Sequence, residues 1–268
     1  MYVNLFDSHV LSDNSYDGEH SITFLCENAQ RKELTGLCIT DHYDLEENAH
    51  QANMSLQNSF IETARARLAF DQRLLISSGI ELGQATRDFQ KAQTLLNKYR
   101  FDFVLGALHS DRSMDNYSCV DFSGLDTDVI LQNYFEEMLE LCQWGKFDVL
   151  AHLTYPLRFI TGKYHIPVDM SKYEELLREI LKTLADKDLG LEISTAGLRS
   201  ELGQLSPTLH YVKLFKELGG QFITFGSEAK CAQELGMGLP EAMEMAKEAG
   251  FDYFAFYRKH EPRMLKII

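Results

Sequence analysis

The sequence has no excess of positive charge. It contains 26 Lys and Arg residues against 40 Asp and Glu residues, which gives a formal net charge of −14. A chain this acidic repels a phosphate backbone, so we expect no nucleic-acid partner. A small anion can still bind where local positive charge or metal ions override the overall field.

Long apolar runs and paired cysteines are also missing. No stretch reaches the about 18 apolar residues of a membrane-spanning helix, so we expect no membrane contact. The first residues lack a basic segment followed by an apolar one, so we expect no signal peptide and a cytoplasmic protein. The five cysteines are odd in number, far apart and without a CxxC pair. They predict reduced, buried thiols.

Apolar runs alternate with helical patterns along the chain, with no linker, repeat or low-complexity segment between them. Strands are expected at residues 2–6, 37–42, 74–81, 101–109, 147–152, 189–195 and 221–230. Helices are expected at 20–34, 48–70, 87–99, 129–144, 170–187, 207–218 and 240–250, before a terminal strand at 251–257. With 45% hydrophobic residues, the chain can bury a sizeable core.

Two α/β architectures fit this alternation. A doubly wound open sheet would gather its ligand residues at one switch point. Polar residues instead follow nearly every strand, which suits a ring of strand ends. The sequence therefore predicts one closed or nearly closed parallel barrel spanning residues 1–268 as a single domain.

Residues that can bind metals stand where the predicted strands end. The pattern begins in residues 6–18, where the apolar residues of the first predicted strand are followed by Asp7, His9 and a polar turn. The full set is Asp7, His9, Asp41, His42, Glu81, His109, His152, Glu192 and Glu228, with Asp17 in the first turn. One such histidine is usually an ordinary polar side chain, but four at separate strand ends predict a common site. Imidazoles and carboxylates together suit zinc, manganese or iron, and Glu81 could bridge two ions.

The order and spacing of these motifs resemble the polymerase-and-histidinol-phosphatase (PHP) family of metal-dependent phosphoesterases, in particular its histidinol-phosphatase branch. The matching segments are Asp7 to Gly18, Thr40-Asp41-His42, Gly79-Ile80-Glu81, His109, His152, and Glu192 to Arg199. They cover essentially the whole chain. The resemblance implies a distorted (β/α)₇ barrel with up to three metal ions at the carboxyl ends of its strands.

Three of the nine ligand positions that the resemblance implies are altered. Leu11 and Lys230 stand where the family has histidines, and Glu228 stands where it has aspartate. By the family pattern, Glu81, His109 and His152 form a complete site. A second site, with His9 and Glu228, loses one imidazole, and a third, with Asp17 and His42, has Lys230 in place of a ligand. We therefore expect one or two divalent ions rather than three.

The lysine admits two interpretations. A protonated ammonium has three donors and no lone pair, so Lys230 cannot ligate a metal in that form. It could instead take part of the third ion's space, neutralise Asp17 and hold a phosphate oxygen. Alternatively, the altered positions indicate a domain that has lost catalytic activity. Metal chemistry needs only one or two well-placed ions, and the retained arginines also favour activity.

The resulting hypothesis is hydrolysis of a phosphate monoester by metal-activated water, with Asp41, Glu81 and His152 as catalytic residues. Arg158 and Arg199 are candidate phosphate clamps, or else surface ion pairs.

Asp41 could orient a histidine or relay a proton, and Glu192 could contact substrate or support the mouth of the site. The family resemblance implies L-histidinol phosphate as substrate, in histidine biosynthesis. Another small phosphate ester is one alternative, and a non-catalytic module that binds a phosphorylated ligand is another. Oligomeric state is left open.

Overall fold

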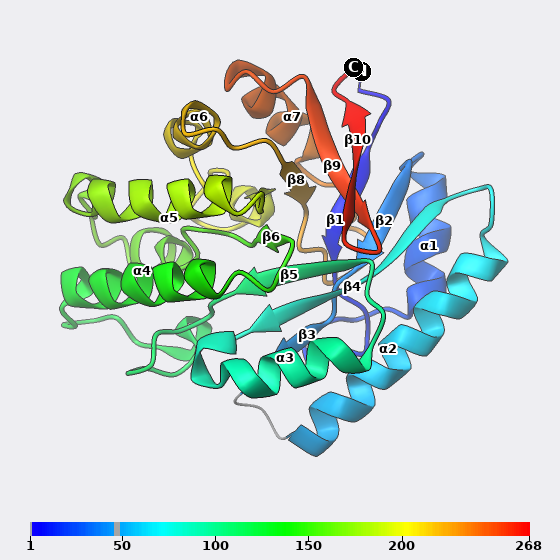
Figure 1. Cartoon of the computed structure of the whole chain (residues 1–268), viewed down its shortest axis with the longest axis horizontal. Helices are drawn as coiled ribbons and strands as arrows, with labels where there is room; N and C mark the ends of the chain where they lie inside the picture. Colours follow the sequence, from blue (N-terminus) through cyan, green and yellow to red (C-terminus); the bar gives the residue numbers. More distant parts are fainter. Residues whose placement is uncertain (1, 46–48) are drawn as a thin grey trace.

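A computed structural model describes residues 2–45 and 49–268, and its centre is a nearly closed parallel barrel (Figure 1). The seven strands, in their order around the barrel, are β1 (Phe6–Val10), β2 (Gly36–Ile39), β4 (Leu75–Gly83), β5 (Phe103–Ala107), β6 (Val149–Leu150), β7 (Gly190–Ser194) and β8 (Ile223–Gly226). A parallel bridge between Val10 and Ala229 joins the two ends of this series. The predicted barrel is therefore confirmed.

Helices surround the strands, as each parallel crossover requires. In the described residues these are α1 (Ile22–Arg31), α2 (Ala49–Ala69), α3 (Phe89–Lys98), α4 (Thr127–Trp144), α5 (Glu174–Asp186), α6 (Leu209–Glu217) and α7 (Leu239–Glu248). The predicted start of the second helix at Asn48 lies outside the described residues. Short helical turns are η1 (Ala85–Arg87), η2 (Tyr117–Cys119), η3 (Arg158–Lys163), η4 (Met170–Tyr173) and η5 (Ala196–Arg199).

Local sequence explains where several helices begin and end. Asp88 and Asp126 cap α3 and α4 by accepting hydrogen bonds from first-turn amides. Gly145 ends α4 in the left-handed conformation, with φ 62°. In α5 the buried residues are Leu177, Ile180, Leu181 and Leu184, a spacing that places them on one face of the helix.

The first strand differs from the prediction. It spans Phe6–Val10 and is buried throughout, whereas the sequence placed it at residues 2–6. Val3, in the expected strand, is 61% exposed. The hydrophobic pattern was misleading because Asp7 and His9 lie inside the strand, where hydrogen bonds compensate their burial.

The second strand is interrupted. The expected strand at 37–42 is present as β2 and the short β3 (His42–Asp44), which both pair with β4. Thr40 and Asp41 separate them, and the Glu81 amide still donates to the Asp41 carbonyl at 3.2 Å. The break leaves His42 in register with Glu81.

The chain ends in a hairpin of which the sequence predicted only the first strand. β9 (Tyr253–Arg258) pairs antiparallel with β10 (Glu261–Lys266). The two turn residues, Lys259 and His260, have φ of 54° and 64°, as a tight hairpin requires. β10 is largely exposed and polar, so hydrophobic patterning could not reveal it.

This hairpin packs against the amino ends of the barrel strands. Phe256 stacks on Phe6 at 4.8 Å between ring centroids, and Tyr257 stacks on Phe103 at 5.0 Å. Phe6 and Phe103 are the first residues of β1 and β5. The amino end of the barrel is thereby covered, which leaves the carboxyl end for a site.

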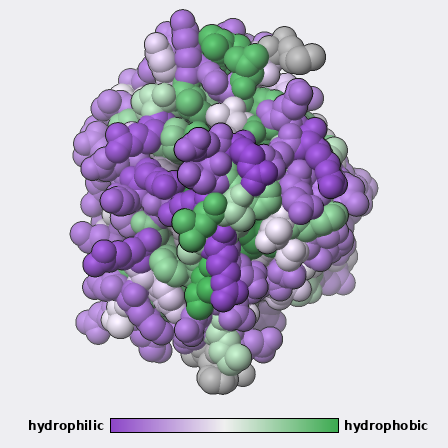
Figure 2. All heavy atoms as spheres, turned by 90° about the vertical axis from the view of Figure 1, so that its right-hand side faces the viewer, coloured by the Kyte–Doolittle hydropathy of each residue, from purple (hydrophilic) through white to green (hydrophobic). Residues whose placement is uncertain are grey.

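The outer surface is mainly hydrophilic on the face that Figure 2 shows, with smaller hydrophobic areas between the polar side chains. Within the described residues, no helix combines the length and apolarity needed to cross a membrane. All five cysteines are described and carry free thiols; three are buried.

Asp7 ties β1 to the segment after β8. Its carboxylate accepts hydrogen bonds from the Ser227 amide at 2.9 Å, the Ser227 hydroxyl at 2.5 Å and the Gly236 amide at 2.9 Å. The side chain is fully buried, and burial raises the pKa of Asp7. The acid that the first motif supplies therefore closes the barrel.

We predict that Asp7→Ala destabilises the fold by roughly 2–4 kcal/mol, because a buried amide, a partly buried amide and a hydroxyl lose their acceptor. Urea denaturation would measure this loss. Asp13→Ala, at an exposed position in the same motif, should change stability by less than about 0.5 kcal/mol. Equal stabilities for the two variants would show that Asp7 does not hold the barrel closed.

Candidate active site

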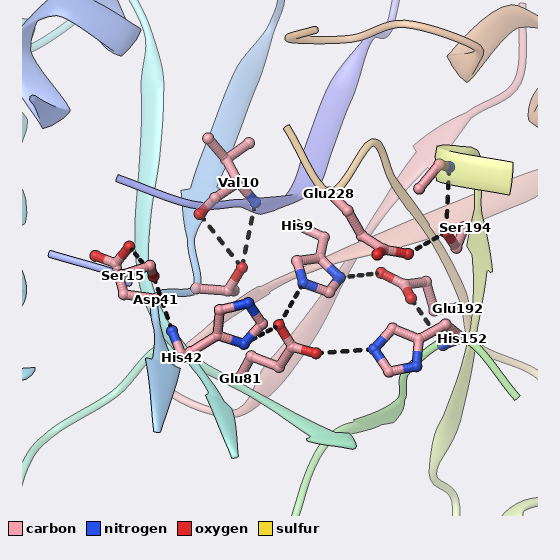
Figure 3. Close-up of polar contacts among 12 residues, drawn as sticks. His9, Val10, Ser15, Asp41, His42, Glu81, His152, Glu192, Ser194 and Glu228 are labelled. Carbon is pink, nitrogen blue, oxygen red and sulfur yellow. Dashed lines mark hydrogen bonds and ion pairs between the residues drawn. The ribbon is translucent and has the colours of Figure 1, made fainter. Parts of the chain in front are cut away.

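The carboxylate of Glu81, in β4, lies among four histidines at the carboxyl end of the barrel. Figure 3 shows three of them, His9, His42 and His152. Its Oε2 is 2.8 Å from His9 Nε2 and 3.0 Å from His42 Nδ1. Its Oε1 is 2.9 Å from His109 Nε2 and 2.8 Å from His152 Nε2.

Four different strands deliver these imidazoles. His9 lies in β1 and His42 in β3, while His109 and His152 follow β5 and β6. The strands are parallel, so their carboxyl ends meet at one rim. His152 has φ 26°, a sparsely populated backbone conformation of the kind found at functional sites.

Further carboxylates orient the imidazoles from behind. Glu192 in β7 lies 2.8 Å from His9 Nδ1 and accepts a hydrogen bond from the His152 amide at 2.9 Å. Gly226 permits this approach, because a Cβ there would come within 2.2 Å of Glu192 Oε1. Glu192 thus contacts the ring of one histidine and the backbone of another.

Asp44 gives the same support to His109. Its two oxygens lie 3.2 and 3.3 Å from His109 Nδ1. The sequence analysis missed Asp44. Its signal is the spacing His42-Tyr43-Asp44, since alternate residues of a strand lie on the same face.

The close packing of carboxylates and imidazoles shifts the pKa values of both kinds of group. Burial alone would raise the pKa of Glu81, but His42, His9 and His109 together hold that pKa well below its ordinary value. Burial would lower the pKa of His109, yet Asp44 and Glu81 raise it to about 10. A cation entering this cluster must displace imidazole protons, because only the neutral ring can ligate.

The donor set fits a divalent metal. His42, Glu81 and His109 offer ligand atoms within 4.8 Å of one another, and so do His9, Glu192 and Glu228. Among the described residues, the buried Nδ1 of His152 has no hydrogen-bond partner. Buried polar atoms are normally paired, so this nitrogen is available to an ion.

Lys230 lies beside Asp17 at the edge of this cluster. Its Nζ is 2.7 Å from Asp17 Oδ2, and Asp17 Oδ1 is 3.5 Å from His42 Nε2. The lysine side chain is half exposed. The ammonium thus pairs with Asp17, as one of the two interpretations of this lysine requires.

Glu228 faces an arginine. Arg158 Nη1 donates to Glu228 Oε2 at 2.6 Å, and Arg158 Nη2 donates to Oε1. The hydroxyl of Ser194 also donates to Oε1. Burial would raise the pKa of Glu228, but Arg158 holds it well below its ordinary value.

The side chain of Arg199 contacts the segment that contains Glu228. Its Nη2 donates to the Ser227 carbonyl at 2.8 Å, and its Nε is 3.4 Å from Glu234. Among the described residues, Arg199 Nη1 and Arg158 Nε are buried without a hydrogen-bond partner. Each guanidinium therefore retains an unused donor.

A pocket of about 670 Å³ gives access to these groups. Its lining includes Glu81, His42 and His109, the cations Arg158, Arg199 and Lys230, and the carboxylates Glu201 and Glu234. Leu11 also lines it. Metal-type ligands and anion-binding groups therefore share one cavity.

Aromatic residues that the sequence analysis did not select complete the walls. Tyr155 packs against His109 and His152 at 5.2 and 5.0 Å between ring centroids. Tyr16 stacks on His42 at 5.0 Å. Periodicity alone could not distinguish these rings from core aromatics.

Asp41 is not brought into the cluster. Its carboxylate accepts hydrogen bonds from the Ser12 amide and from the hydroxyls of Ser12, Ser15 and Ser59. Figure 3 shows the contact with Ser15. The Ser15 hydroxyl in turn accepts a hydrogen bond from the His42 amide. Asp41 therefore shapes the first loop, and its predicted contact with an imidazole is made by Asp44 and Glu192.

Comparison with known proteins places this barrel and its buried centre in a family. Residues 7–196 match the PHP domain. The chain belongs to the PHP domain family. The expected resemblance is thereby confirmed.

Relatives of similar length carry related names. The chain is 29% identical over 251 residues to a probable histidinol-phosphatase of Thermotoga maritima, covering 94% of this chain and 95% of that one. It is 26% identical over 254 residues to the histidinol-phosphatase of Lactococcus lactis subsp. lactis, covering 94% and 93%.

A solved structure shows the same fold. It is the Lactococcus lactis histidinol phosphate phosphatase complexed with zinc, L-histidinol and phosphate. It superposes with a TM-score of 0.84 at 24% identity, covering 97% of this chain and 99% of that one.

Asp44→Asn should weaken binding of Mn²⁺ or Zn²⁺ by roughly 10- to 100-fold, because a carboxylate behind a ligating imidazole fixes its orientation and basicity. Metal titration by calorimetry would measure this change. Asp88→Asn, which retains the cap of α3, should leave the affinity unchanged. Equal metal affinity in Asp44→Asn and the parent chain would remove Asp44 from the site.

Proposed function

We propose that this protein hydrolyses a phosphate monoester with the help of one or two divalent metal ions. One observation carries the proposal: the buried Glu81 carboxylate contacts four imidazoles at a pocket that also contains guanidinium and ammonium groups. Metal-type ligands beside anion-binding groups are the parts that phosphoryl transfer to water requires.

The residues that would hold an ion are Glu81 and the imidazoles around it, His9, His42, His109 and His152. Such an ion, when bound, supplies a Lewis acid and permits deprotonation of water near neutral pH. Glu192 and Asp44 keep the imidazoles fixed, so the ligand set needs little rearrangement.

The phosphate would lie between the fixed cations of the pocket. Arg158 Nε and Arg199 Nη1 have unused N–H groups, and a guanidinium matches the geometry of phosphate oxygens. Lys230 Nζ, held by Asp17, adds a point charge where the family pattern has a metal ligand. These cations bind the ester and stabilise the charge that develops on its oxygens.

For the substrate we propose L-histidinol phosphate, hydrolysed to L-histidinol and phosphate. The names of the full-length relatives support this choice. The lining of the pocket is compatible with it, because the carboxylates of Glu201 and Glu234 suit an ester with a cationic organic part.

Phosphate release tests the proposal. Chain loaded with Mn²⁺, Fe²⁺ or Zn²⁺ should release phosphate from L-histidinol phosphate with a higher kcat/KM than from an aryl phosphate. A faster reaction with the aryl ester would keep the hydrolase and reject the substrate. No release from either ester with any of the three metals would favour a module that only binds a phosphorylated ligand.

His152→Ala should lower phosphate release by at least about 1,000-fold and reduce bound metal, because Glu81 loses a neighbouring ligand. Turnover and elemental analysis measure the two effects. His210→Ala removes an exposed imidazole that pairs with Glu174 on the surface, and should change neither. Full turnover by His152→Ala would reject the proposed metal site.

Lys230→His should bind one further ion per chain. The new imidazole would replace an ammonium that pairs with Asp17, and the imidazole of His42 is already nearby. Elemental analysis of protein loaded with Mn²⁺ gives the count. An unchanged count would show that the packing around Leu11 has closed this part of the site.

A further inference from the structure

Glu228 pairs with an arginine at a position where a metal ligand is expected. The family resemblance implies a ligand there, with aspartate as the usual residue. In this chain both carboxylate oxygens accept hydrogen bonds from Arg158, and one also accepts a hydrogen bond from Ser194. The side chains of Glu228 and Arg158 are each only 10% exposed, so water competes little for this contact.

The other possible metal ligands near Glu228 also have hydrogen-bond partners already. His9 and Glu192 lie close enough to form a ligand group with it. However, His9 Nδ1 is 2.8 Å from Glu192 Oε1, and Glu192 Oε2 accepts the His152 amide. Leu11 provides no lone pair where the family has an imidazole. An ion at this point would have to break an ion pair that is already complete.

The ion pair between Glu228 and Arg158 also affects how the arginine can bind an anion. A carboxylate that contacts both Nη atoms occupies the same edge of a guanidinium that two phosphate oxygens would occupy. Only Nε of Arg158 remains without a partner. Glutamate is one methylene longer than aspartate, which extends its carboxylate toward Arg158.

We propose that Glu228 is the counter-ion of Arg158 and competes with phosphate for this guanidinium, instead of ligating a metal. The proposal rests on the phosphate-binding role given to Arg158 in the proposed function. Glu228 then lowers the affinity of the pocket for free phosphate. Weaker binding of the product favours its release, and only binding that is stronger in the transition state accelerates the reaction.

The test measures two quantities on the full-length, as-purified chain: the Kd of inorganic phosphate by calorimetry, and metal per chain by elemental analysis. Glu228→Gln should tighten phosphate binding by about tenfold, because Arg158 loses a charged partner. It should leave the metal content unchanged.

Matched variants separate this effect from a general change in charge. Glu201→Gln removes the same charge from the rim of the same pocket, at a side chain that pairs with His165, and should shift the phosphate Kd by less than about twofold. Arg158→Gln should make phosphate binding insensitive to Glu228→Gln. Glu228→Asp keeps the charge but shortens the reach, and should also tighten phosphate binding, which preserves the test if the glutamine variant does not fold.

Two results would overturn the proposal. A loss of bound metal in Glu228→Gln would make Glu228 a ligand, and unchanged or weaker phosphate binding would show that it does not compete. Neither measurement depends on turnover. A chain that hydrolyses no ester but shows the expected shifts would reject the proposed function and keep the role of Glu228.

Discussion

The structure depends on one buried negative charge, the carboxylate of Glu81. An isolated ionised carboxylate is costly to bury, and this one is about 1% exposed. Four imidazoles compensate it, and Asp44 and Glu192 in turn balance two of those imidazoles. Such a network stabilises the fold only when every member is satisfied. Among the described residues, the unpaired Nδ1 of His152 is a point where this network remains open to a cation.

Fixed cations distinguish this pocket from one in which metal ions alone carry the positive charge. Lys230 pairs with Asp17, and Arg158 pairs with Glu228. A side-chain cation cannot leave the site or exchange with solvent, and unlike a metal it does not activate water. The two ion pairs therefore supply charge for an anion, while the imidazoles around Glu81 keep the capacity for metal chemistry.

Sequence alone predicted the barrel, and it selected the histidines that the structure brings together around Glu81, because each follows or ends an apolar run. It misplaced β1, since Asp7 and His9 are buried polar residues whose partners are distant in the chain. It missed Asp44 and gave its role to Asp41, because Asp41 lies in the break before β3 and Asp44 at the end of β3, and only packing separates their roles. The pairing of Glu228 with Arg158 spans 70 residues of sequence, so no local pattern encodes it.

Anomalous X-ray diffraction from crystals grown with Mn²⁺ or Zn²⁺ would show whether Glu81 and its imidazoles bind a metal, because it locates each ion by its own scattering. We expect a peak within ligand distance of a Glu81 oxygen and of at least two of the surrounding imidazole nitrogens, about 2.0–2.2 Å for zinc. Crystals that contain the metal but show no peak beside Glu81 would contradict it.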